Sequence, residues 1–206
     1  MDPRRSESFI MRWFSRFGDF FGLSLLWLLC CVPVLTIAPA SIALYDTVAH
    51  CLHGKEDGPY RRFFRTLKAE LLPGLGLSAL WGIVFTLLIL GYQITTTAGS
   101  GTLAATYSML YAGTLLIPLA MFLWVIPIQS RFRYRFLDLH RTALSYTVIH
   151  LPTTAGMLLT MIVTVVLLLT VPVLFMLLPA ICATVQAWLI EKVFVQYMPE
   201  DDDDDA

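Results

Sequence analysis

Charged residues are scarce in this chain. Only 14% of its 206 residues are charged, and 57% are hydrophobic, whereas a soluble domain carries about 25% charged residues. One water-soluble core cannot hide that much apolar side-chain surface, so the lipid bilayer must serve as part of the solvent. The composition excludes an ordinary soluble domain and indicates an integral membrane protein with a single compact helical domain.

Excess charge of one sign is also lacking, since the formal net charge is -1. The charges are segregated, however, because six of the fifteen acidic residues occupy positions 200–205. Blocks of acidic residues are usually disordered and solvated. We therefore expect residues 196–206 to form a disordered acidic tail behind an otherwise basic body, which keeps the C-terminus away from the anionic membrane surface.

Patterns that carry chemistry are lacking as well. The four cysteines lie in or beside apolar runs without metal-ligand spacing, which favours small buried hydrophobic side chains over disulfides. His50 and His53 are three residues apart, but no further metal ligand is near them in the sequence. No phosphate loop and no dinucleotide glycine pattern is present. The sequence predicts no catalytic residue, no cofactor and no metal site, and therefore a protein that is not an enzyme.

Long hydrophobic runs are what the sequence has. The first, at about 20–52, would make a helix about 50 Å long against about 30 Å of hydrocarbon. It contains "CCVPVLTIAPASIALYD" at 30–46, in which Pro33 and Pro39 are six residues apart. Because proline removes a backbone donor and clashes with the preceding turn, we expect the helix to break there. Two short segments then form a hairpin that enters the membrane and returns.

The expected fold class is all-α and integral to the membrane. An aromatic-rich amphipathic helix at 1–21 is expected to lie in the membrane interface, followed by one polytopic domain at 20–195. The six expected membrane segments are 20–34, 37–52, 72–93, 104–129, 148–174 and 176–195.

The basic residues predict the topology. They cluster at the N-terminus, at 55–68, at 131–141 and at Lys192, whereas the loops at 94–103 and 172–179 have none. Cytoplasmic loops are enriched in lysine and arginine. Only a hairpin over 20–52 places all these clusters on one side. We expect a multi-pass membrane protein with both termini in the cytoplasm.

Two basic and aromatic stretches, "YRRFFR" and "RFRYRF", each precede a membrane segment that begins near a proline, Pro73 or Pro152. We interpret them as two cytoplasmic elbow helices. In the first, at 59–70, Tyr60, Phe63, Phe64 and Leu67 are expected to share one apolar face. The anionic bilayer and a protein partner remain equal candidates for these surfaces, and nucleic acid is disfavoured. The candidate docking residues are Arg61, Arg62, Phe63, Phe64, Arg65, Lys68, Arg131, Arg133 and Arg135.

The helix break carries the remaining candidate residues: Pro33, Thr36, Pro39, Tyr45 and Asp46. Irregular backbone at membrane depth must be buried in protein or face a watery cavity. We therefore expect residues 34–39 to pack against other helices, with the Thr36 hydroxyl bonded to a freed backbone group. Asp46 is the only acid inside an otherwise apolar stretch, and we expect it to form a structural ion pair or a helix cap.

This part of the chain resembles the YesL family of bacterial membrane proteins. The family pattern is a Trp-containing helix, "PVxTIGPAxxALY", a short charged turn and an "FF..FK" elbow. Ala38 replaces the more usual glycine, and "LPxT" at 151–154 also resembles the family, so the similarity extends over roughly 17–195. The matching residues are Pro33, Thr36, Pro39, Ala40, Ala43, Leu44, Tyr45, Phe63, Phe64 and Lys68.

The resemblance implies an accessory role in sugar import, because YesL proteins are commonly encoded beside carbohydrate ABC importers. We therefore expect a non-enzymatic accessory or regulatory subunit that contacts the importer's permease subunits. The alternatives are a small independent solute transporter or channel, and a membrane-bound sensor. Few membrane-buried polar groups argue against a sugar pathway within one chain. Homo-oligomerisation, which would allow a shared pathway, is left open.

Overall fold

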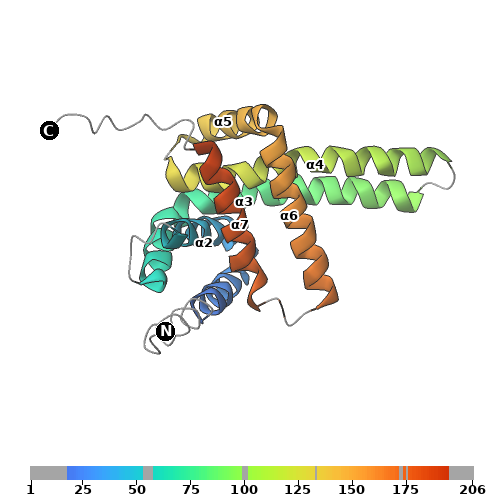
Figure 1. The fold of residues 1–206 in the computed structure, drawn as a ribbon. Coiled ribbons are helices and arrows are strands. Elements are labelled where there is room, and N and C mark those ends of the chain that lie inside the picture. The colour runs from blue at the N-terminus through green and yellow to red at the C-terminus, as the bar shows by residue number, and fades with distance from the viewer. Residues whose placement is uncertain are drawn as a thin grey trace, which may run out of the picture.

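The computed structural model describes residues 18–52, 58–98, 102–132, 134–171, 174 and 176–194. Every regular element in these residues is helical, which confirms the all-α class. The elements, shown in Figure 1, are a helix Gly18–Cys31, the 3-10 helix η1 (Val34–Thr36), α2 (Ile37–Leu52), α3 (Pro59–Ala98), α4 (Thr102–Arg131), α5 (Phe136–Ile149), α6 (Leu151–Thr170) and α7 (Leu178–Phe194).

Helix α2 lies at the centre of the packing and contacts α3, α4 and α7. Its apolar side chains supply the core: Ile42 and Tyr45 are buried in the main cluster together with Trp124 of α4 and Ile190 of α7. A second cluster joins α2 to Phe63 of α3 and to the helix Gly18–Cys31. One short helix therefore packs against three others, and it carries Asp46 and His50 of the site described below.

The expected break is present. The helix Gly18–Cys31 ends before Pro33, and η1 leads into α2. The Thr36 hydroxyl bonds the carbonyl oxygens of Cys30 and Pro33, so the expected bond to a freed backbone group is confirmed.

The packing of the break differs from the expectation. Val34 and Leu35 are exposed on the outer side of the bend, whereas Ala38 and Pro39 are buried against α3. The Ala38 N–H donates a hydrogen bond to the Ser78 hydroxyl of α3 at 3.0 Å. A one-turn 3-10 helix has too few residues to bury all its sides, so only the part that enters α2 is covered.

The first elbow is not a separate helix, which corrects the sequence expectation. Helix α3 runs without interruption from Pro59 to Ala98, with Pro73 inside it. In Figure 1 its teal first part lies at an angle to its green second part. Pro73 itself is exposed, and the buried stripe continues past it on the other side of the helix. Tertiary packing thus outweighs the proline's missing donor. The stripe consists of Phe63, Glu70, Gly74, Leu77 and Trp81.

The second elbow is a separate helix, as expected. α5 ends at Ile149, and α6 begins at Leu151, with His150 between them in a non-helical conformation. Pro152 lies in the first turn of α6, where a missing backbone donor costs nothing. Figure 1 shows α5 crossing the end of α6.

Three described helices are long and apolar enough to cross a membrane: α3, α4 and α6. Few residues in the apolar segments of these helices are buried in the single chain, as expected for helices that lipid covers. The helix Gly18–Cys31 and α2 are shorter, as the hairpin interpretation requires. Of the six predicted segments, the structure thus identifies three as long enough to cross. Figure 1 shows the α3–α4 hairpin extending away from α6 and α7.

Three predictions fall outside the described residues. They are the interfacial helix at 1–21, of which only the last residues are described, the acidic tail at 196–206, and the position of Arg133.

Candidate functional site: buried ion pairs among four helices

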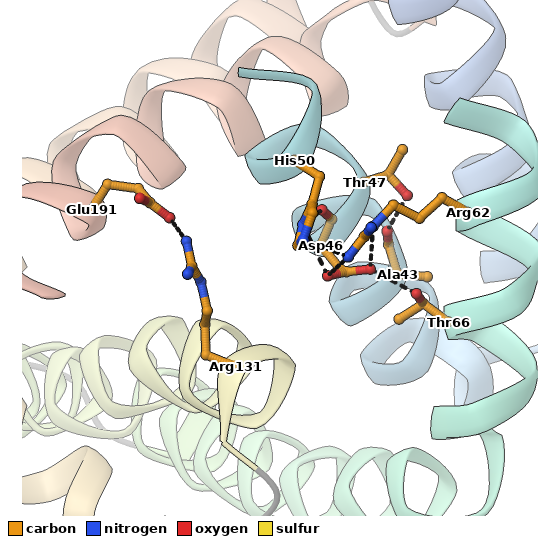
Figure 2. A network of polar contacts seen from close by, with 8 residues as sticks. All are labelled: Ala43, Asp46, Thr47, His50, Arg62, Thr66, Arg131 and Glu191. Carbon is orange, nitrogen blue, oxygen red and sulfur yellow. Dashed lines mark hydrogen bonds and ion pairs between the residues drawn. The ribbon is translucent and has the colours of Figure 1, made fainter. Parts of the chain in front are cut away.

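Asp46 of α2 is buried and forms an ion pair with Arg62 of α3 (Figure 2). The Arg62 guanidinium donates from Nε to Oδ2 at 2.9 Å and from Nη2 to Oδ1 at 3.0 Å. The Thr66 hydroxyl, one turn further along α3, donates to Oδ2 at 2.7 Å. Two-point contact of this kind is the strongest geometry for a carboxylate. The structural ion pair expected for Asp46 is therefore present.

His50 extends this network along α2. Its Nδ1 lies 3.1 Å from the Asp46 carbonyl oxygen, and its Nε2 lies 2.7 Å from Nη2 of Arg62. Because arginine only donates, Nε2 must accept and Nδ1 must carry the ring proton. His50 is thereby held as a partner of the ion pair.

A second ion pair joins α4 to α7. Arg131 donates to the Glu191 carboxylate, and Figure 2 shows this pair on the other side of α2 from Asp46. Tyr45 of α2 is buried in the core, and its hydroxyl has no hydrogen-bond partner among the described atoms. Charged side chains thus hold α2 to α3 and α4 to α7.

Sequence reasoning missed Glu70. It is buried in α3 and accepts a hydrogen bond from Nε2 of Gln129 in α4 at 3.0 Å, both side chains being buried. The signal was available, because position 70 is seven residues from both Phe63 and Leu77 and therefore lies on the same helix face as these buried residues. Glu70 and Gln129 complete a set of polar contacts that joins α2, α3, α4 and α7.

The docking candidates divide into two groups. Arg62 and Phe63 face inward: Phe63 is 0% exposed, and Arg62 binds Asp46. Phe64, which was predicted to share the apolar face of Phe63, is 45% exposed among the cations. The two positions are about 100° apart on the helix, and Phe63 is the one that faces the core. We define the α3 basic surface as Arg61, Phe64, Arg65 and Lys68, all exposed.

The second elbow divides in the same way. Arg131 ends α4 and is occupied by Glu191, whereas Arg135 is exposed at the N-cap of α5. Three arginines were predicted to dock here. Arg131 is paired with Glu191, Arg133 lies outside the described residues, and Arg135 is exposed.

The "LPxT" step has a structural role. The Trp124 indole N–H of α4 donates to the Thr154 hydroxyl at 2.9 Å, and that hydroxyl lies 2.9 Å from the His150 carbonyl oxygen. Thr154 thus joins three helices at one point: α4, the end of α5 and the start of α6. This contact fixes the direction in which α5 leaves the bundle.

Replacing Thr154 by valine should destabilise the protein by about 1 to 2 kcal/mol, because the buried Trp124 N–H loses its acceptor. Thr160→Val is the matched control on the same helix, since the Thr160 hydroxyl bonds only the Gly156 carbonyl oxygen within α6. Thermal unfolding in detergent, followed by circular dichroism, measures both. Equal losses in the two variants would contradict the three-helix contact.

These features define the class of protein: an all-helical membrane protein whose polar side chains hold helices together at one buried and one partly buried ion pair. Among the described residues no group of histidine, cysteine and acidic side chains has the arrangement of a metal site. The family described as "Protein of unknown function, DUF624" matches residues 20–92. That stretch contains the helix break, Asp46, Arg62 and the α3 basic surface. No curated protein and no solved structure matches the chain.

Proposed function

We propose that this protein is a non-enzymatic accessory or regulatory membrane subunit of a carbohydrate ABC importer, which docks through the α3 basic surface. The class of importer comes from the resemblance to the YesL family. The observation that carries the docking is the spacing of Arg61, Phe64, Arg65 and Lys68. These positions are i, i+3, i+4 and i+7, so the four exposed side chains share one helix face.

Such a face suits a protein partner. Helices that dock into grooves use anchors at this spacing, and arginine and aromatic residues dominate the energetics of protein interfaces. The opposite face of the same turns is held by the Asp46–Arg62 pair and by buried Phe63. The surface is thereby presented on a rigid support, which lowers the entropy that is lost on binding.

The proposal includes the topology inferred from the basic clusters: a bacterial cytoplasmic membrane, with both termini in the cytoplasm. Support comes from the end of α7, where Trp188 is exposed and the Lys192 ammonium lies 3.5 Å from the centre of its ring. A tryptophan beside a lysine is typical of a membrane–water interface. Arg131 lies at the same end through its pair with Glu191.

The test is a charge reversal restricted to the outer face: Arg61→Glu, Arg65→Glu and Lys68→Glu together. Arg62 is left unchanged, because its loss would break the buried pair. We expect the importer subunits that co-purify with the wild type from native membranes to be lost from this variant. The control is Arg135→Glu with Arg141→Glu on α5, which should retain them. A triple variant that inserts normally and keeps every partner would overturn docking through α3.

A further inference from the structure

Helix α5 has three distinct faces. Leu139, Ala143 and Thr147 are buried against the bundle. On a second face Leu137, Leu144 and Val148 are 71%, 47% and 62% exposed. Positions 137, 144 and 148 are spaced i, i+7 and i+11, so these side chains form one apolar stripe.

The third face carries polar side chains over most of its length. Asp138 and Ser145 are exposed and lie seven residues apart, about 100° around the helix from the apolar stripe. The exposed Ile149 lies on the same side at the end of α5, next to the start of α6. Arg141 is also exposed, at the boundary between the apolar and polar faces. A long cationic side chain at this boundary can lay its methylene groups on apolar surface while its charge reaches headgroups or water. An apolar stripe, a cation at its boundary and polar residues beyond it are typical of a helix that lies in a membrane interface.

The apolar stripe continues into a membrane-crossing helix. Only His150 separates α5 from α6, and Leu151 at the start of α6 is exposed as well. Only 11% of the residues in the apolar segment of α6 are buried in the single chain, so lipid must cover most of this segment. The same lipid surface therefore reaches the α5 stripe without a boundary. Figure 1 shows α5 lying across the end of α6, where the bilayer surface would be.

We infer that α5 is an interfacial helix that binds the anionic headgroup region of the bilayer, with Leu137, Leu144 and Val148 inserted. Arg135 and Arg141 supply positive charge for the headgroups, and Asp138 and Ser145 face water. The two elbows then have different partners: lipid for α5, and protein for the α3 basic surface. This inference does not depend on the proposed role in sugar import.

The experiment compares two adjacent exposed positions, Leu144→Cys and Ser145→Cys, each carrying a nitroxide spin label. Both are made in a background in which Cys30, Cys31, Cys51 and Cys182 are alanine, and circular dichroism establishes that each variant is helical. The purified protein is reconstituted in vesicles of phosphatidylcholine with phosphatidylglycerol, so that no other protein is present. Accessibility to oxygen, which enriches in lipid, is compared with accessibility to a water-soluble nickel chelate.

We expect the ratio of oxygen to nickel accessibility to be several-fold higher at position 144 than at position 145. Two water-accessible labels would overturn the inference and favour a protein partner for the stripe. Two lipid-accessible labels would also overturn it, because α5 would then lie inside the hydrocarbon. The ratio at position 144 should fall in vesicles of phosphatidylcholine alone, and an unchanged ratio would refute the preference for anionic lipid.

Discussion

Asp46→Ala is expected to lower the free energy of unfolding by about 3 to 5 kcal/mol, because it leaves the Arg62 guanidinium buried without its counter-charge. Both side chains are only 11% exposed. Thr66 and His50 also lose the carboxylate that they contact. Chemical unfolding in detergent micelles, with tryptophan fluorescence as the readout, measures the change. The network would have no such role if the loss matched that of Asp138→Ala, an exposed acid on α5 that should change stability by less than about 0.5 kcal/mol.

A double-mutant cycle separates the ion pair from general damage to α2. Arg62→Met alone leaves Asp46 uncompensated, whereas Arg62→Met combined with Asp46→Ala removes both charges. Replacing a whole buried pair by apolar side chains is often neutral or stabilising. We therefore expect the double variant to be more stable than either single variant. Additive losses would show that the two side chains act independently.

Gly74→Leu is expected to destabilise the fold by about 3 kcal/mol, since overpacking a tight contact forces backbone shifts. A Cβ on Gly74 would lie 2.8 Å from Cβ and 3.1 Å from Cα of Pro39, at the place where α3 crosses the start of α2. Pro39 is a rigid ring at the beginning of a helix and cannot swing away. The loss should appear as a lower midpoint of thermal unfolding in detergent.

Gly76 provides the matched control. It lies two residues along the same helix, and a Cβ there meets nothing within 4 Å. Gly76→Ala should therefore stabilise α3 by up to about 1 kcal/mol through helix propensity alone, whereas Gly74→Ala should destabilise the protein. The two alanine variants thus differ in sign. A gain in stability for Gly74→Ala would refute the close approach of α3 to Pro39.

Structural features that depend on residues close together in the sequence could be predicted, because local chemistry decides them. The break at Pro33 and the Thr36 bond follow from a missing donor and from carbonyl groups released nearby. The separate elbow α5 follows from its amphipathic period and from Pro152, which is suited to a first helical turn. Pro73 has the same sequence signal and the opposite outcome, because the buried stripe from Phe63 to Trp81 holds α3 together across it.

The buried polar contacts show the limit of periodicity. Asp46 was expected to form an ion pair or a helix cap, but its partner Arg62 was assigned to a docking surface. Glu70 was not considered, and Phe64 was predicted to share the apolar face of Phe63. Periodicity tells which residues share a face of one helix, but not how that face is rotated relative to its neighbours. Rotating the helix by one residue would exchange which of Phe63 and Phe64 faces the core. It would also change which cations face a partner.

The sequence by itself determined that the protein is helical and membrane-embedded, because its apolar excess and long runs leave no other way to satisfy the backbone. It also determined where the first long run breaks. Only the tertiary structure decided which charges are used inside: Asp46 with Arg62, and Arg131 with Glu191. The physical reason is that an ion pair between helices depends on their mutual rotation and depth, which are set by packing of all the helices together. The surfaces left for lipid and for a partner are what remains once those buried pairs are formed.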